Sequence, residues 1–403
     1  MTTRSPLFRR LPALYALLTL LACTWPPAPD HEDLGLRLSQ RVDSLMVRAI
    51  GNRAFPGAAV AIGNADSLVL MRAYGQFTYD DAPAITTASQ FDMASLTKII
   101  ATTTVTMKLL EADRLSLDDR VSNYIPAFAQ SGKANITLFH LLSHTAGLRP
   151  YRAFHTEGLL TREEVIDAIM AEPLRTPPGT EARYSDFSMI TLALVIEHIT
   201  GQPFADVARQ LVFEPLGMMD TGFRPTVADN RVVPTEIDSG FRKRLIQGEV
   251  HDETAWLLGG TAGHAGLFST VEDVARFTRM MVNAGRVDST QFLQPETIQL
   301  FTTRLDPTAE RHTRALGWDT RALIGKRSSA GLFLGPNSYG HTGFTGTSMW
   351  IDPDADLYVI MLSNRVYPSR RNRRYAAVRS ELADIAYRTL IQPNAAPVMR
   401  ASP

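Results

Sequence analysis

The chain has 403 residues, of which 45% are hydrophobic and 20% are charged, so it can bury one large core or two lobes. Lys+Arg and Asp+Glu both number 41, which gives a formal net charge of +0. Because a balanced charge creates no summed field that attracts polyanions, we exclude nucleic acid as an expected partner and expect a small-molecule or peptide substrate.

Residues 1–22 have the pattern of an export signal. Arginines precede an apolar run at 11–22 that is too short to span a bilayer. The run ends in Leu20-Leu21-Ala22-Cys23, which resembles the cleavage box of bacterial lipoproteins, whose cysteine is acylated. The alternative is a chance cysteine in an ordinary signal peptide. We expect an exported protein that is lipid-anchored at Cys23 to a bacterial membrane and faces the periplasm or the cell exterior.

Residues 23–35 are predicted to form a tether. The stretch 24–30 is rich in proline, which stiffens a linker between a membrane and a domain. Cys23 is the only cysteine of the chain, so we expect no disulfide within the chain. The folded domain is predicted at 36–391, followed by a tail at 392–403, and we expect it to be a monomer.

The first predicted elements are a helix and a hairpin. Apolar residues recur at helical intervals from Leu34 to Ile50, and Gly51 follows as a stop signal. Two apolar runs at 58–62 and 67–70 then flank a turn-forming segment, which predicts two antiparallel strands.

The middle of the chain is predicted to be helical, because its apolar residues have helical periodicity. The predicted helices are 96–110, 162–170, 187–200 and 270–284. Ser269 and Glu272 have the spacing of a capping box at the start of the last of these helices. The end of the chain predicts another hairpin, at 348–351 and 357–362, and a final helix at about 375–391.

These elements predict an α+β fold. Strands at both ends of the chain can form one antiparallel sheet covered by terminal helices, with an all-helical lobe inserted at roughly 110–270.

Ser95 and Lys98 begin the first predicted helix of the middle segment. Residues three positions apart lie on the same side of a helix, so Lys98 can reach the Ser95 hydroxyl. A serine becomes a strong nucleophile when a base takes its proton, and a lysine can be that base if burial lowers its pKa. The apolar stripe of this helix indicates that it is buried. An isolated pair with this spacing is far more often a helix cap followed by a surface lysine, so further motifs are needed.

Two further motifs follow in order. Tyr184-Ser185-Asp186 precedes a predicted helix, and His341-Thr342-Gly343 precedes the C-terminal hairpin. With Ser95 and Lys98, they resemble the S-x-x-K, Y-x-N and K-T-G motifs of serine β-lactamases and penicillin-binding proteins. The stretches 141–148, 213–218 and 259–267 resemble the branch that contains class C β-lactamases, penicillin-binding carboxypeptidases and related esterases.

The resemblance implies a role for each matching position. Ser95 would be the acylated nucleophile, Lys98 its proton acceptor, and Tyr184 the group that passes a proton to the leaving group and activates water. The backbone amides of Ser95 and Phe344 would form the oxyanion hole. The substrate would be bound by Asp186, His341, Thr342 and Gly343.

Two positions depart from the family pattern. Asp186 stands where the family has an asparagine, and a carboxylate cannot donate the amide hydrogen bond unless it is protonated. The alternative for Asp186 is that it caps the helix beginning at Phe187. His341 stands where the family has a lysine, and an imidazole holds a positive charge less securely at neutral pH. The alternative for His341 is a surface loop.

Three other polar segments are candidates for a site. His251-Asp252-Glu253 has metal-ligand residue types without the spacing of a zinc helix, so we expect a polar loop, no metal and no cofactor. His144 and His264 are expected to brace loops around the cleft, and His264 is also a candidate for lining the pocket.

The predicted function is a serine hydrolase that forms an acyl-enzyme, most simply a penicillin-binding D-alanyl carboxypeptidase or a related hydrolase of cell-wall peptides. An ester hydrolase on the same fold is the alternative. A non-catalytic cell-wall-binding or sensor module is the alternative of another class.

Overall fold

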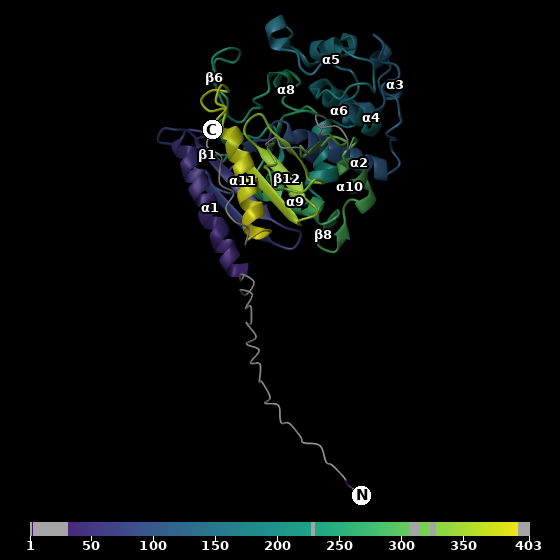
Figure 1. Ribbon diagram of the computed structural model, residues 1–403. Helices are drawn as coiled ribbons and strands as arrows, with labels where there is room; N and C mark the ends of the chain where they lie inside the picture. The colour runs from purple at the N-terminus through teal and green to yellow at the C-terminus, as the bar shows by residue number, and fades with distance from the viewer. Residues whose placement is uncertain (1, 3–30, 227–229, 307–313, 323–327, 394–403) are drawn as a thin grey trace.

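The computed structural model describes residue 2 and residues 31–226, 230–306, 314–322 and 328–393 (Figure 1). The predicted signal peptide, Cys23, the tether up to residue 30 and most of the predicted tail lie outside the described residues. None of the helices in the described ranges has the length and apolar character needed to cross a membrane.

A six-stranded antiparallel sheet is assembled from both ends of the chain, as the sequence predicts. Its strand order is β10-β11-β12-β13-β1-β2. The strands are β1 (Gly57–Gly63), β2 (Leu68–Gly75), β10 (Asp319–Thr320), β11 (Tyr339–Thr342), β12 (Ser348–Asp352) and β13 (Leu357–Ser363). The ends meet where β1 pairs with β13, with Ala58 opposite Ser363. Every residue of β1 and β13 is buried, which requires cover on both faces of the sheet.

Helices supply that cover. The terminal helices α1 (His31–Gly51) and α11 (Tyr375–Leu390) lie side by side on one face, in purple and yellow in Figure 1. Their apolar stripes share a core with the sheet, in which Val42 and Leu382 pack with Val60. Helix α9 (Val271–Val282) packs on the strands from the other side. The central strands are therefore enclosed between two helical layers.

Helix ends differ from the sequence-based expectation by a few residues. Helix α1 begins at His31, so residues 31–35 of the predicted tether are helical, and Leu34 is already buried. At the start of α9, the Thr270 side chain accepts a hydrogen bond from the amide of Asp273. The capping box predicted for Ser269 and Glu272 is therefore wrong by one position.

The middle of the chain is largely helical and packs beside the sheet, as predicted (Figure 1). Its helices are η1 (Lys98–Thr103), α2 (Thr104–Glu111), α3 (Val121–Tyr124), η2 (Pro126–Ala129), α4 (Leu138–Leu142), η3 (Phe154–Glu157), α5 (Arg162–Ala171), α6 (Asp186–Thr200), α7 (Phe204–Ala208), η4 (Arg209–Phe213) and α8 (Glu253–Leu257). Helix α10 (Pro295–Thr302) follows α9.

The inserted segment is not all-helical, which corrects the prediction. It contains the short strands β4 (Gly222–Phe223), β5 (Ile237–Asp238) and β6 (Arg244–Leu245). A three-stranded sheet has the order β3-β7-β4, with β3 at Phe91–Asp92 and β7 at Leu267–Ser269. A further hairpin joins β8 (Arg286–Val287) and β9 (Thr290–Gln291). The strand β3 leads directly into Ser95, so this small sheet positions the predicted nucleophile.

Candidate active site

The turn that carries Ser95 is held by a buried carboxylate. Asp92 accepts hydrogen bonds from the amide of Ala94 at 2.8 Å and from the amide of His251 at 2.6 Å. Ala94 has a φ of 46°, in the left-handed region that non-glycine residues seldom adopt. Such strained residues persist only where their surroundings fix them, and they cluster at functional sites. The turn therefore presents Ser95 in a conformation that the surrounding structure imposes.

The helix after Ser95 begins at Leu96, as predicted, and continues to Glu111. Residues 98–103 form the π-helical segment η1, which continues as the α-helix α2. All residues of η1 are buried, as the apolar stripe predicts. Short π-helical segments inside α-helices occur frequently at functional sites.

Ser95 Oγ receives two hydrogen bonds from side chains of different segments. The Nζ of Lys98 lies 3.0 Å away, and the hydroxyl of Tyr184 donates across 2.8 Å. Tyr184 lies just before α6, 89 positions further along the chain. The structure therefore brings the three residues of the predicted trio together at one oxygen atom.

Lys98 is fully buried and its ammonium has further partners. Nζ donates to the main-chain oxygen of His264 at 2.9 Å and lies 2.9 Å from Oδ1 of Asp186. The Lys98 side chain is 0% exposed and that of Asp186 is 18% exposed. A lysine ammonium has three donors, so the contacts with Ser95, His264 and Asp186 use all of them.

The pKa of Lys98 corrects an expectation from the sequence. Burial does lower the pKa, but the carboxylate of Asp186 and the hydroxyl of Tyr184 outweigh burial and leave the pKa raised. Lys98 is therefore charged at neutral pH. It does not meet the condition under which a lysine directly accepts the proton of a serine.

Tyr184 is partly buried and remains protonated. Burial raises its pKa, and the opposing effect of the Lys98 charge is smaller. Its ring packs against His144, with centroids 4.9 Å apart, and against His341, with centroids 5.8 Å apart. The guanidinium of Arg314 lies 4.9 Å from the centre of the same ring. Tyr184 is therefore fixed as a hydrogen-bond donor to Ser95.

Asp186 is the first residue of α6 and does not cap it. The cap is Ser185, whose side chain accepts a hydrogen bond from the amide of Ser188. The cap alternative for Asp186 is therefore wrong. Its carboxylate lies at the positive end of the α6 dipole and pairs with Lys98.

His341 lies on strand β11 and is 2% exposed, so the surface-loop alternative is wrong. Its Nδ1 lies 2.8 Å from the main-chain oxygen of Thr342, which makes Nδ1 the protonated nitrogen of a neutral ring. Burial lowers the pKa of His341, and the charges of Lys98 and Arg314 act in the same direction. The expectation of a weakly held positive charge at this position is consistent with this direction.

The turn after β11 is bonded to the nucleophile turn. Thr345 donates to the main-chain oxygen of Asp92 at 2.7 Å, and Thr347 donates to that of Met93 at 3.0 Å. A Cβ on Gly343 would lie 2.6 Å from the same oxygen of Met93, so only glycine allows this approach. Phe344 follows, with 49% of its surface exposed. The predicted oxyanion pair therefore lies on two turns that are fastened to each other.

The two predicted bracing histidines do hold loops together. His144 Nδ1 accepts the amide of Ser185 at 3.2 Å, and burial lowers the pKa of His144 well below its usual value. The His264 imidazole lies 3.0 Å from Oδ1 of Asp252. Neither ring is hydrogen-bonded to Ser95, although the main chain of His264 fixes Lys98.

Ser95 opens into a pocket of about 350 Å³. Residues that the sequence did not assign to the site line it together with Ser95, Tyr184, Asp186, His264 and Phe344; they are Tyr151, His251, Asp252, Glu253 and Arg370. Arg370 is paired with Glu253 at 2.7 Å and with Glu236 at 2.6 Å. The segment predicted as a polar loop is therefore one wall of the pocket. The described ranges contain no group of three or more side chains able to hold a metal ion.

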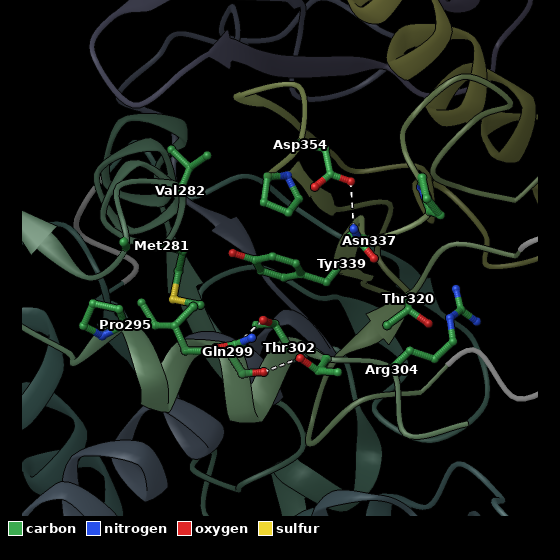
Figure 2. Close-up of a pocket in the computed structure, with 15 residues that line it drawn as sticks. Met281, Val282, Pro295, Gln299, Thr302, Arg304, Thr320, Asn337, Tyr339 and Asp354 are labelled. Carbon is green, nitrogen blue, oxygen red and sulfur yellow. Dashed lines mark hydrogen bonds between the residues drawn. The ribbon is translucent and has the colours of Figure 1, made fainter. Parts of the chain in front are cut away.

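A larger cavity of about 650 Å³ lies elsewhere, between α9, α10 and β11 (Figure 2). Figure 2 shows the hydroxyl of Tyr339 directed toward Met281 and Val282 inside it. None of the residues lining this cavity is a predicted site residue. The smaller pocket, which contains the Ser95 arrangement, is therefore the candidate active site.

Known proteins share both the sequence and the fold. A protein of Escherichia coli K12 named "Putative D-alanyl-D-alanine carboxypeptidase" is 30% identical over 344 residues, covering 77% of this chain and 79% of that relative. The structure titled "EstCE1, a hydrolase with promiscuous acyltransferase activity" matches with a TM-score of 0.73 and 25% identity, covering 88% of this chain and 99% of that one.

A third likeness concerns the fold alone. The octameric penicillin-binding protein homologue from Pyrococcus abyssi matches with a TM-score of 0.66 and 21% identity, covering 84% of this chain and 76% of that chain. The model of the family described as Beta-lactamase matches residues 40–383, a span that includes the Ser95 turn, the Tyr184 segment and strand β11. The chain therefore belongs to the Beta-lactamase family of serine hydrolases and penicillin-binding proteins.

Proposed function

We propose that the protein hydrolyses its substrate through an acyl-enzyme on Ser95, and that it acts as a D-alanyl carboxypeptidase on cell-wall peptides. The observation that carries the proposal is the convergence of Lys98 and Tyr184 on Ser95 Oγ, at 3.0 Å and 2.8 Å. The name of the Escherichia coli relative supports the substrate class.

The arrangement suits each step of acyl transfer. Ser95 Oγ attacks the substrate carbonyl, and its proton leaves by way of Lys98, which is charged at rest and must first release a proton of its own. The amides of Ser95 and Phe344 stabilise the oxyanion. Tyr184, which is protonated and lies 2.8 Å from Ser95, donates a proton to the leaving amine and then takes one from the attacking water.

A carboxypeptidase must also bind the substrate's terminal carboxylate. His341 is neutral and cannot supply the charge, but Arg314 lies against the Tyr184 ring, with a side chain that is 22% exposed and paired with Asp319. We propose that Arg314 binds the carboxylate.

The change Arg314→Ala should raise KM for D-Ala-D-Ala peptides by about 10- to 100-fold, which is the worth of a charge-assisted hydrogen bond. Hydrolysis of an uncharged nitrophenyl ester should keep its KM. Release of D-alanine and of nitrophenol measures the two reactions, and Arg321→Ala, just beyond strand β10, is the matched control. An equal rise in KM for both substrates would show that Arg314 does not recognise a carboxylate.

Ester hydrolysis is the second candidate function. The observation that favours it is the neutral, buried His341 at the position where the family pattern has a lysine. Faster release of nitrophenol than of D-alanine, together with no effect of Arg314→Ala on either reaction, would favour the esterase.

We propose that the protein is exported and lipid-anchored at Cys23, on the basis of the apolar run at 11–22 and the cleavage box that ends it. The change Cys23→Ser should move the protein from the membrane fraction to the soluble fraction. Globomycin should block processing of the unaltered chain. A mature protein that begins at another residue would remove the anchor.

A further inference from the structure

In the described part of the chain, both hydrogen bonds of Ser95 Oγ are accepted by it, and no acceptor for its own proton is found there. Ser95 Oγ accepts from both Lys98 and Tyr184, so both partners are donors in the resting site. Lys98 uses its three N–H groups on Ser95, His264 and Asp186 and has no lone pair to offer. Lys98 can therefore take the Ser95 proton only after it has released one of its own.

Among the described partners of the Lys98 ammonium, Asp186 is the carboxylate that can accept a proton and hold it, whereas Tyr184 already carries its own proton. The main-chain oxygen of His264 and the hydroxyl of Ser95 are far weaker bases than a carboxylate. Oδ1 of Asp186 lies 2.9 Å from Nζ, a distance suited to direct proton transfer. The family pattern has an asparagine here, whose amide cannot serve as such an acceptor.

We propose that Asp186 is the final acceptor of the Ser95 proton, which reaches it through Lys98. An N–H bond of Lys98 breaks as an O–H bond forms on Asp186 Oδ1. The neutral amine turns about its terminal C–N bond, and its lone pair then takes the Ser95 proton as Oγ bonds to the substrate carbonyl carbon. Lys98 ends charged, Asp186 ends protonated, and no proton is gained or lost by the site.

The relay also gives Asp186 a second ability. Asp186 lines the Ser95 pocket, so a protonated Asp186 lies beside the bound substrate. A protonated carboxyl can donate a hydrogen bond, which the carboxylate cannot. The donor that the family asparagine supplies permanently is thus present in this chain after the first proton transfer.

The variant Asp186→Asn separates this relay from a merely structural role. In the unaltered enzyme the pKa of Lys98 is raised, so Lys98 stays charged and the rate should be flat from about pH 7 to about pH 9. Asparagine removes the main group that raises the pKa, and burial then lowers it. Only neutral Lys98 can act in this variant, so its rate should increase about 10-fold per pH unit below the new pKa of Lys98.

Several titratable groups interact with this pair and bear on its pH dependence. Besides each other, Lys98 and Asp186 interact with Tyr184, Tyr151, Asp252, His144 and His341. Lys98 lowers the pKa of His144, of His341 and of Asp252. Asp186 raises the pKa of Tyr184 and of Tyr151, so both pKa values fall in Asp186→Asn, and the ascending limb is assigned to Lys98 if it persists when Tyr184 is also replaced by phenylalanine.

The experiment measures the rate of Ser95 acylation by a nitrophenyl ester between about pH 5 and about pH 10. We expect a loss of about 100-fold for Asp186→Asn near pH 6 that diminishes as the pH rises, and a profile of unaltered shape for Asp186→Glu, which keeps a carboxylate. Glu197→Gln, which removes a paired carboxylate at the other end of α6, is the control.

The inference rests on the proposed function, and the two can fail separately. If the unaltered protein is never acylated at Ser95, the proposed function fails. If it is acylated, and the acylation rate of Asp186→Asn depends on pH in the same way as that of the unaltered enzyme, the relay is wrong. A uniform decrease of the rate at every pH would not rescue it. If Asp186→Asn does not fold, an ascending limb in Asp186→Glu would likewise contradict the relay.

Discussion

Replacing Ser95 by alanine should lower kcat/KM by about 10⁵-fold for any substrate of the enzyme, because the change removes the atom that forms the covalent bond. Covalent labelling by a fluorescent penicillin or a fluorophosphonate should be lost together with turnover. The fold should be retained, since Ser95 Oγ accepts its two hydrogen bonds from groups that have other partners or face the pocket.

Ser188→Ala is the matched control for this prediction. Ser188 lies on α6, and its buried hydroxyl has no hydrogen-bond partner among the residues that the structure describes, so its removal should change neither labelling nor turnover. Turnover that survives in Ser95→Ala would mean that another group carries the chemistry. Ligand binding by Ser95→Ala, with no turnover by the unaltered chain, would instead favour a sensor module.

Replacing Lys98 by methionine should lower kcat/KM by at least about 1,000-fold, since the first proton transfer loses the group that contacts both Ser95 and Asp186. The loss should persist at every pH, because methionine cannot titrate. This separates Lys98→Met from Asp186→Asn, whose rate recovers at alkaline pH.

A second buried lysine supplies the control for Lys98→Met. Lys133 is also 0% exposed and donates to the main-chain oxygens of Met170 and Glu172, both at 2.7 Å. Lys133→Met leaves these oxygens unpaired and should lower Tm while the folded enzyme keeps its kcat/KM. If Lys98→Met lost stability but kept its rate, Lys98 would be a structural residue.

The sheet and the nucleophile pair were predictable from the sequence because each depends on local periodicity. Alternating or continuous apolar runs at both ends of the chain predicted the strands of the central sheet. The spacing of Ser95 and Lys98 places both residues on the same side of a helix, and this does not depend on what the helix packs against. The π-helical form of η1 had no such local signal, since its residues have the same apolar pattern as an α-helix.

The wall of the pocket could not be predicted in the same way. Asp252 and Arg370 lie more than a hundred residues from Ser95 along the chain, and no motif relates their spacing. The adjacency of three polar residues at 251–253 is a signal for this wall, but it predicts a polar loop and does not indicate that the loop faces Ser95. The raised pKa of Lys98 could not be predicted from the sequence either, because it depends on the contact with Asp186, which is distant along the chain.

The short distances between the three motifs explain why a carboxylate is tolerated at Asp186. In an isolated buried position it would be costly, but it forms an ion pair with Lys98 at the start of α6. The contact with Asp186 keeps Lys98 charged, and in the proposed relay the Asp186 carboxylate accepts the Ser95 proton. The two departures from the family pattern therefore have different effects. His341 replaces a positively charged lysine in the substrate site with a neutral ring. Asp186 replaces a neutral asparagine with a negative charge beside Lys98.

The most direct test of the account is mass spectrometry of the intact protein after brief incubation with a D-Ala-D-Ala peptide, a nitrophenyl ester and a cephalosporin, followed by peptide mapping. The account predicts an acyl adduct on Ser95 that forms with the peptide and the ester and disappears as water releases the product. An adduct on any other residue, or turnover of the peptide with Ser95 unmodified under conditions that trap acyl-enzymes, would contradict it.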